Sequence, residues 1–234
     1  MNDIKKIAAK IHKAILDILF PLVCICCKKH IDSDAEGPIC ADCLASIVTN
    51  RHINKVQAGL ELMSVGNYED GSLRTIIHAF KYERVRPIER TLDSLIKRYL
   101  DNIDVSKIID VRNSVIIPIP LYPQKERLRG FNQAEIIANI LGTRLKIKVL
   151  TGAIRRVKNT KPQISLASHK NRETNIKNSF ALRDSLETYG EILKGKNIIL
   201  VDDVYTSGST IKEAIRVIRQ LKPAKIQAFV IAKA

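Results

Sequence analysis

Residues 197–210 read NIILVDDVYTSGST, and the four apolar residues at 198–201 are followed by two adjacent aspartates. A short apolar run of this kind is typical of a strand that is buried on both faces. Residues 210–221 carry apolar side chains at helical spacing, and Pro223 ends this pattern before a second predicted strand at 225–231. Strand, helix and strand in this order form a β-α-β unit, which predicts a parallel sheet in an α/β fold.

The turn between the first strand and the helix has the composition of a phosphate site. The free N–H groups at a helix start favour a bound phosphate, small hydroxyl side chains add donors, and Gly208 lets the backbone approach closely. Carboxylates repel phosphate, so the two aspartates indicate a ligand that also carries hydroxyls, such as ribose 5-phosphate. The candidate ligand-binding residues are Asp202, Asp203, Val204, Tyr205, Thr206, Ser207, Gly208, Ser209 and Thr210.

Two other interpretations of this turn are weaker. A Walker loop needs Gly-Lys followed by Thr or Ser after a four-residue spacer, and the turn lacks that pattern. A purely structural helix cap stays open, although two adjacent acids at the end of a buried strand are costly without a ligand or a cation.

The cysteines form two CxxC pairs, Cys24 with Cys27 and Cys40 with Cys43, separated by twelve residues. Four thiolates at this spacing are typical of a structural zinc site. A segment this short has almost no core of its own, so metal binding would supply its folding energy. Disulfides are the alternative, which a reducing cytoplasm disfavours. Cys26 could compete with Cys27, but the double CxxC register favours Cys27.

The chain is strongly basic, with 39 Lys and Arg against 24 Asp and Glu, a net charge of +15 and a pI near 9.7. This balance indicates nucleic acid, an acidic membrane surface or a phosphorylated small molecule as partner, unless it reflects a lysine-rich proteome. Residues 136–172 contain no acid, whereas an ordinary solvated face mixes charges of both signs. The nine basic residues of this span are Arg144, Lys146, Lys148, Arg155, Arg156, Lys158, Lys161, Lys170 and Arg172.

Residues 1–20 are expected to form an amphipathic helix, because isoleucines recur at helical spacing with lysines between them. This helix either docks on its own domain or binds a membrane surface. The interleaved lysines argue against a signal peptide, and no apolar stretch reaches the roughly 18 residues of a transmembrane helix. We therefore expect a cytoplasmic protein without a transmembrane segment.

The rest of the chain adds elements that fit the same α/β class. We expect strands at 60–65 and 115–117, helices at 73–82, 88–100 and 132–141, and an irregular basic stretch at 144–175.

Several motifs, spread over nearly the whole chain, together resemble the ComF family of competence proteins. They are the cysteine pairs, Tyr68-x2-Gly71-x-Leu73-Arg74 with Lys81, Pro118-Ile119-Pro120, Arg129-Gly130-Phe131-Asn132-Gln133-Ala134, Thr160-Lys161-Pro162-Gln163, Arg172-x2-Asn175 and the 202–210 turn. The resemblance implies a type I phosphoribosyltransferase fold, a parallel sheet flanked by helices, with a small N-terminal zinc-binding module. The expected units are a helix at 1–20, a separate zinc-finger module at 21–50 and a phosphoribosyltransferase-like domain at 60–234.

The resemblance also implies ligands for the basic residues. In type I phosphoribosyltransferases, the turn that corresponds to the one after the strand at 115–117 holds pyrophosphate. The basic residues after Pro120 are therefore candidates for binding diphosphate oxygens, unless they form a solvated basic turn. The 136–172 span resembles the flexible catalytic loop that closes over the ligand, and it could equally be a track for a nucleic-acid backbone. The candidates for pyrophosphate or DNA contact are Arg127, Arg129, Arg155, Arg156, Lys158, Lys161 and Arg172.

The role associated with the family is the handling of incoming single-stranded DNA during natural transformation. We therefore expect a competence-type protein that binds phosphoribosyl pyrophosphate (PRPP) with Mg²⁺, single-stranded DNA and other DNA-uptake proteins, and that holds a structural zinc. The alternative is an active phosphoribosyltransferase that transfers phosphoribose to a nitrogen acceptor, with Mg²⁺ on the diphosphate. A third possibility is a regulatory protein that only senses the ligand. Fold alone does not choose among them, and the sequence identifies neither the acceptor base nor a catalytic residue.

Overall fold

The computed structural model describes residues 22–31, 37–56, 59–82, 88–159, 176–183 and 186–234. The helix expected at 1–20 lies outside the described residues, as do Lys161, Arg172 and the other motif positions at 160–175. In the part of the chain that is described, no helix has the length and apolar character needed to span a bilayer.

The fold is built on a six-stranded sheet with the strand order β1-β2-β8-β7-β3-β4. All neighbouring strands run parallel except β1, which pairs antiparallel to β2. The parallel arrangement confirms the prediction drawn from the last third of the sequence. The strands are β1 Asn54–Lys55, β2 Glu61–Asn67, β3 Ser114–Pro118, β4 Lys148–Val149, β7 Asn197–Tyr205 and β8 Lys225–Lys233.

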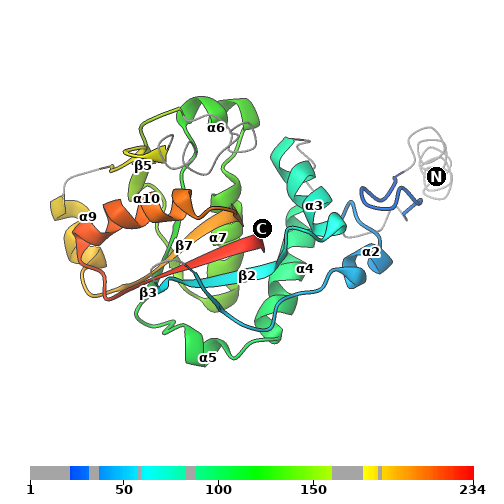
Figure 1. Ribbon diagram of the computed structural model, residues 1–234, viewed down its shortest axis with the longest axis horizontal. Helices are drawn as coiled ribbons and strands as arrows, with labels where there is room; N and C mark the ends of the chain where they lie inside the picture. Colours follow the sequence, from blue (N-terminus) through cyan, green and yellow to red (C-terminus); the bar gives the residue numbers. More distant parts are fainter. Residues whose placement is uncertain (1–21, 32–36, 57–58, 83–87, 160–175, 184–185) are drawn as a thin grey trace, which may run out of the picture.

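Helices cover both faces of the sheet, and a small antiparallel pair of strands, β5 and β6, lies beside α10 (Figure 1). The helices are α2 Ala41–Ser46, α3 Gly71–Tyr82, α4 Ile88–Asp101, α5 Val105–Ile108, α6 Pro123–Arg129, α7 Gln133–Leu145, α9 Leu186–Leu193 and α10 Ser209–Ile218, which continues as a 3-10 turn, Arg219–Leu221. The strands of this pair are β5 Ile154–Arg156 and β6 Phe180–Leu182.

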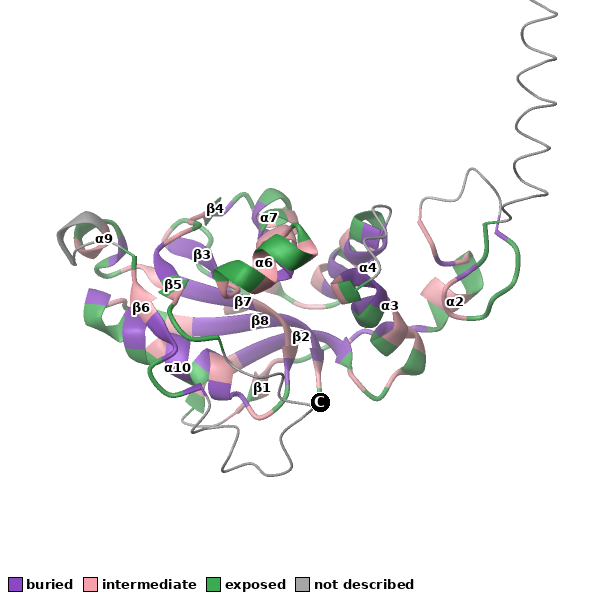
Figure 2. Ribbon diagram, turned by 90° about the horizontal axis from the view of Figure 1, so that it is seen from above, coloured by how far each residue is buried: buried purple, intermediate pink, exposed green. Residues whose placement is uncertain are grey.

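Side chains of the central strands contribute alternately to two separate cores, because successive side chains of a strand point to opposite faces of the sheet. Ile199 and Val201 of β7 pack in one core with α3, α4 and α7. Ile198 and Leu200 pack in the other core with α10 and β5. Figure 2 shows the buried strands between α4 and α7 on one side and α10 on the other. Aliphatic packing on both faces explains why β7 is an unbroken apolar run.

The main difference from the sequence-based expectation concerns the end of β7. The strand was expected to stop at residue 201, but it continues to Tyr205, because its pairing with β8 extends to Tyr205 opposite Lys233. Its pairing with β3 ends earlier, at Pro118 opposite Val201. The two aspartates therefore lie inside β7, at the point where one neighbouring strand has ended.

The stretch at 144–175 is less irregular than expected. Within its described part, β4 pairs with β3, and β5 pairs with β6. These strands are only two and three residues long, which is too short for a periodic pattern to identify. The expectation of an irregular stretch was therefore wrong for these residues.

The cysteine-rich segment packs against α3 and α4 of the sheet domain. Cys24, Ile39 and Ile47 are buried in the same core as α3 and α4. The Arg98 guanidinium of α4 donates to the Leu44 carbonyl at 3.0 Å and to the Ile47 carbonyl at 2.7 Å. Figure 1 shows this segment, in blue, beside α3 and α4. The segment thus buries its apolar side chains against α3 and α4, and the sequence pattern did not reveal this packing.

Candidate functional site

A cavity of about 560 Å³ opens at the carboxyl ends of β3 and β7. The chain leaves β3 toward α7 on one face of the sheet and leaves β7 toward α10 on the other face. Such a divergence between neighbouring parallel strands creates the crevice in which open α/β sheets bind ligands. The cavity walls come from α3, α6, α7, β5 and the turn that joins β7 to α10.

The turn at residues 206–208 folds tightly over Tyr205. Gly208 has a φ of +73°, and a Cβ at this position would lie 2.2 Å from the Tyr205 hydroxyl oxygen. Gly208 also occupies the N-cap of α10, where it has no side chain to accept from the first N–H groups of the helix. Those N–H groups and the helix dipole suit a phosphate at the cavity end of α10.

Replacing Gly208 with alanine is expected to lower the free energy of unfolding by at least about 1–2 kcal/mol, the usual cost of a left-handed conformation for a residue with a Cβ. The clash with Tyr205 adds to that cost. Chemical denaturation measures the change. Gly71→Ala is the matched control, because an added Cβ there meets nothing within 4 Å. Equal stability of the two variants would show that the turn does not constrain Gly208.

Asp202 and Asp203 form an acid pair on the cavity wall. The Asp203 N–H donates to Asp202 Oδ1 at 2.9 Å, and Lys81 Nζ of α3 lies 3.0 Å from Asp203 Oδ2. Burial, and then the charge of Asp203, raise the pKa of Asp202 to about 7. The pair therefore carries less than two full negative charges at neutral pH. Donors such as sugar hydroxyls, or a cation, would stabilise its ionised form.

Lys81 is a mostly buried cation that faces this acid pair. Burial favours its neutral form, but the carboxylates of Asp203 and Asp202 outweigh burial and raise the pKa of Lys81. The ammonium is therefore charged at neutral pH, and it joins α3 to the carboxyl end of β7.

Three further cations line the cavity, namely Lys125 and Arg129 of α6 and Arg156 of β5. Arg129 Nη1 donates to Gln133 Oε1 at 2.9 Å, and its guanidinium carbon lies 5.4 Å from the centre of the Tyr82 ring. Burial, and then the charges of Arg156 and Arg129, lower the pKa of Lys125. Because these cations repel one another, a polyanion placed among them is favoured.

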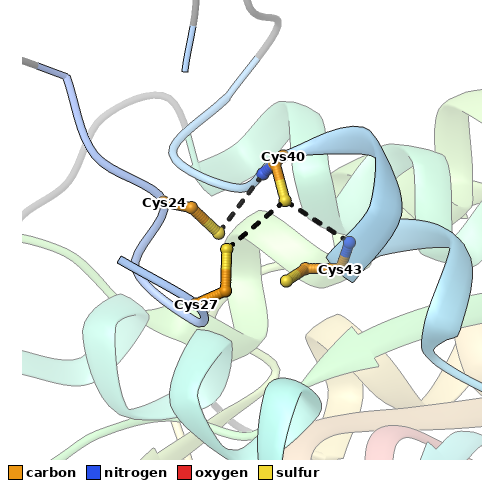
Figure 3. A group of neighbouring side chains, drawn as sticks. All are labelled: Cys24, Cys27, Cys40 and Cys43. Carbon is orange, nitrogen blue, oxygen red and sulfur yellow. Dashed lines mark hydrogen bonds between the residues drawn. The ribbon is translucent and has the colours of Figure 1, made fainter. Parts of the chain in front are cut away.

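A second candidate site is the cluster of Cys24, Cys27, Cys40 and Cys43 (Figure 3). The four sulfur atoms lie within 4.8 Å of one another, so the group could hold a metal ion such as zinc. The Cys40 N–H donates to Cys24 Sγ at 3.4 Å, and the Cys43 N–H donates to Cys40 Sγ at 3.5 Å. Burial alone would raise the pKa of Cys24, but backbone N–H groups outweigh it and lower that pKa to about 6. At least one sulfur is thus a thiolate near neutral pH, as metal binding requires.

Cys26 lies outside this cluster. Its Sγ lies 3.7 Å from the Ser72 carbonyl oxygen on α3, and burial raises its pKa to about 11. The preference for Cys27 over Cys26, expected from the CxxC register, is confirmed by the cluster geometry.

Comparison with known proteins identifies the family. Residues 127–234 match the model of the phosphoribosyl transferase domain. The chain is 31% identical to competence protein F of Haemophilus influenzae over 218 residues. These residues cover 91% of this chain and 90% of that protein. The chain belongs to the ComF family. Its sheet domain has the type I phosphoribosyltransferase fold, and the four clustered cysteines lie in its N-terminal region.

Two other ComF relatives are more distant. The DNA utilization protein YhgH of Escherichia coli O6:H1 is 24% identical over 223 residues, 90% of each chain. Competence protein ComFC of Bacillus subtilis is 29% identical over 129 residues, which cover 55% of this chain and 48% of that protein.

Most of the residues predicted to bind the ligand at 202–210 line the cavity. Of the predicted ligand-binding residues, Ser207 and Ser209 do not line the cavity, and their hydroxyl oxygens lie 2.9 Å apart. The residues that do line it are Asp202, Asp203, Val204, Tyr205, Thr206, Gly208 and Thr210.

The basic residues that were predicted as one group occupy different surfaces of this ComF chain. Arg129 and Arg156 line the cavity, whereas Arg127, Arg155 and Lys158 are exposed and do not. Successive residues of a strand point to opposite faces, so Arg155 and Arg156 of β5 lie in different environments. Within the same acid-free span, Arg144 is bound to Asp93 of α4, with Nε 2.8 Å from Oδ1.

Sequence analysis missed the contribution of α3 and α7 to the cavity. Lys81 was part of a family motif but had no role, and Tyr82 was not a candidate; both end α3 and line the cavity. Gln133 was part of a motif too, and it lines the cavity at the start of α7. A lysine in the last turn of a helix is ordinary, because it complements the helix dipole. Apart from that motif, no signal in the chain therefore marked Lys81 as part of the site.

Proposed function

We propose that this ComF-family chain binds PRPP with Mg²⁺ in the cavity and contacts single-stranded DNA on its basic surface during DNA uptake. The observation that carries the proposal is the arrangement of three kinds of group around one cavity. A helix start suits the 5′-phosphate, the acid pair suits the ribose hydroxyls, and the cations suit the diphosphate. The names of the relatives, competence protein and DNA utilization protein, support the biological role.

Each end of PRPP has a matching group on the chain. Backbone N–H groups of α10 bind the 5′-phosphate, and the carboxylates of Asp202 and Asp203 accept from the ribose hydroxyls. Lys125, Arg129 and Arg156 face the diphosphate. When bound, Mg²⁺ supplies further neutralisation of the diphosphate charge. Zinc in the four-cysteine cluster has a structural role, because four protein ligands leave no open position for a substrate.

The DNA surface includes Arg155 and Lys158, which are exposed at and just after β5. Replacing both with alanine is expected to weaken binding of every labelled single-stranded oligonucleotide tested. The salt dependence, log K against log [salt], should flatten by about 0.7 for each phosphate that the variant no longer neutralises, because fewer counterions are released. Titrations at several salt concentrations measure both effects.

The control for this experiment is Lys107→Ala with Arg112→Ala. Both residues are exposed and carry the same total charge; Lys107 lies in α5, and Arg112 is four residues beyond the end of that helix. Arg156 is left unchanged, because it lines the cavity. Equal binding by both variants and wild type, or no binding at low salt, would contradict a DNA track on this surface.

An alternative function, transfer of phosphoribose from PRPP to a nitrogen acceptor, is favoured by one observation. Asp202, with its pKa near 7, could exchange a proton at neutral pH inside the cavity. Incubation with PRPP, Mg²⁺ and a panel of nucleobases tests this alternative. A product from any acceptor would support a transferase, and PRPP binding without turnover would support a binding protein.

A further inference from the structure

Lys81 and Asp203 form an ion pair across the cavity, between α3 and β7. Lys81 Nζ lies 3.0 Å from Asp203 Oδ2, and the two side chains are 23% and 14% exposed. Lys97 and Asp101 of α4 form a pair of similar length, 3.1 Å, with side chains that are 58% and 61% exposed. The Lys81–Asp203 pair is thus largely withdrawn from water, whereas the Lys97–Asp101 pair is an ordinary surface contact.

A largely buried ion pair is a weak source of stability, because the loss of hydration offsets much of the attraction between the charges. If one partner is then taken away, the other is left as an uncompensated charge, which is strongly unfavourable. Ligand hydroxyls that bind Asp203 at Oδ2 compete with the ammonium of Lys81, which lies 3.0 Å from that oxygen. Favourable binding therefore requires two new contacts: ligand hydroxyls must bind Asp203, and another anion must pair with Lys81.

We propose that Lys81 determines ligand specificity by exchanging partners: it neutralises Asp203 in the empty cavity and binds the diphosphate when the ribose hydroxyls take Asp203. This inference rests on the proposed function of the cavity. PRPP supplies both replacements, since its hydroxyls and its C1 diphosphate belong to the same sugar. Ribose 5-phosphate supplies the hydroxyls but carries no anion at C1, so it leaves the ammonium without a new partner.

The position of Lys81 suits this exchange. It belongs to the last turn of α3, and the neighbouring Tyr82 also lines the cavity and lies under the guanidinium of Arg129. A lysine side chain is flexible and ends in a compact charge with three donors, so it can turn from one anion to another without moving the helix. Lys81 can therefore contribute to the same anion-binding wall as Arg129.

The test compares the affinities for PRPP and ribose 5-phosphate, both with Mg²⁺, by calorimetric titration of wild type and variants. Lys81→Met keeps the unbranched apolar stem out to the ε position and removes the charge, whereas Lys81→Arg keeps the charge. Lys97→Met is the matched control on α4. Lys81→Met should weaken PRPP binding by about ten- to hundredfold, the value of one charge-assisted hydrogen bond, and leave ribose 5-phosphate binding unchanged or tighter. Lys81→Arg should keep most of the preference for PRPP.

An equal loss of affinity for both sugar phosphates in Lys81→Met would contradict the inference, because it would make Lys81 only a structural counter-ion of the acid pair. Unchanged affinity for both would contradict it as well. If wild type binds neither sugar phosphate, the proposed function itself fails. Melting temperatures confirm that each variant is folded, and Lys81→Arg provides the comparison if Lys81→Met is not.

Discussion

Replacing Asp202 and Asp203 together with asparagine is expected to abolish the stabilisation that PRPP and Mg²⁺ give to the wild-type protein. A ligand at about 100 times its dissociation constant stabilises the folded state by roughly 2.7 kcal/mol. Asparagine keeps the size of the side chains but removes the negative charge that ribose hydroxyls and Mg²⁺ favour. The whole ligand-dependent rise in melting temperature should therefore disappear.

The ligand-dependent shift, rather than the absolute melting temperature, is the quantity to compare. The double variant leaves Lys81 without its carboxylate partner, so the unliganded protein also changes stability. Asp101→Asn with Asp104→Asn is the control, because both residues are exposed and the change in charge is the same. A shift in the acid-pair variant as large as in wild type would refute the assignment of the sugar site.

Loss of zinc is the second change with a large expected effect. Cys40→Ser removes one of the four clustered sulfurs and should abolish tight binding of one zinc per chain. Structural zinc sites bind with apparent free energies of about 10–16 kcal/mol, so we expect much of the stability of this segment to depend on the metal. Because Cys24 and Ile47 share a core with α3 and α4, the destabilisation should extend into the sheet domain.

Metal analysis and chemical denaturation of the purified protein measure these two effects. Cys26→Ser is the matched control, because Cys26 lies outside the cluster and should leave the zinc content at one per chain. A wild-type protein that is free of zinc, folded and has intact thiols would contradict the site, as would an equal loss of metal in both variants.

The sequence predicted best those elements whose structure is determined by residues close together in the chain. The apolar run of β7 has to be buried on both faces, and the two CxxC pairs bring four cysteine sulfur atoms together. Local chemistry at 202–210 also predicted the turn at the cavity. In each case a single stretch of chain carries the whole pattern, so its structure could be derived without knowing the rest of the fold.

The parts that sequence did not predict depend on contacts between distant stretches. The extension of β7 to Tyr205 follows from the length of β8, and the docking of the cysteine segment follows from the surfaces of α3 and α4. The pairing of Lys81 with Asp203 joins residues more than a hundred positions apart. Likewise, adjacent arginines on β5 were treated as one basic surface, although strand geometry sends Arg156 into the cavity and Arg155 to solvent.

A structure of the protein with PRPP and Mg²⁺ bound is the most direct test of the proposed ligand site. The 5′-phosphate should lie against the N-terminus of α10, the ribose hydroxyls should bind Asp202 and Asp203, and the diphosphate should lie among Lys125, Arg129 and Arg156. Crystals grown with saturating ligand but without density in this cavity, or with PRPP bound at another place, would contradict the account.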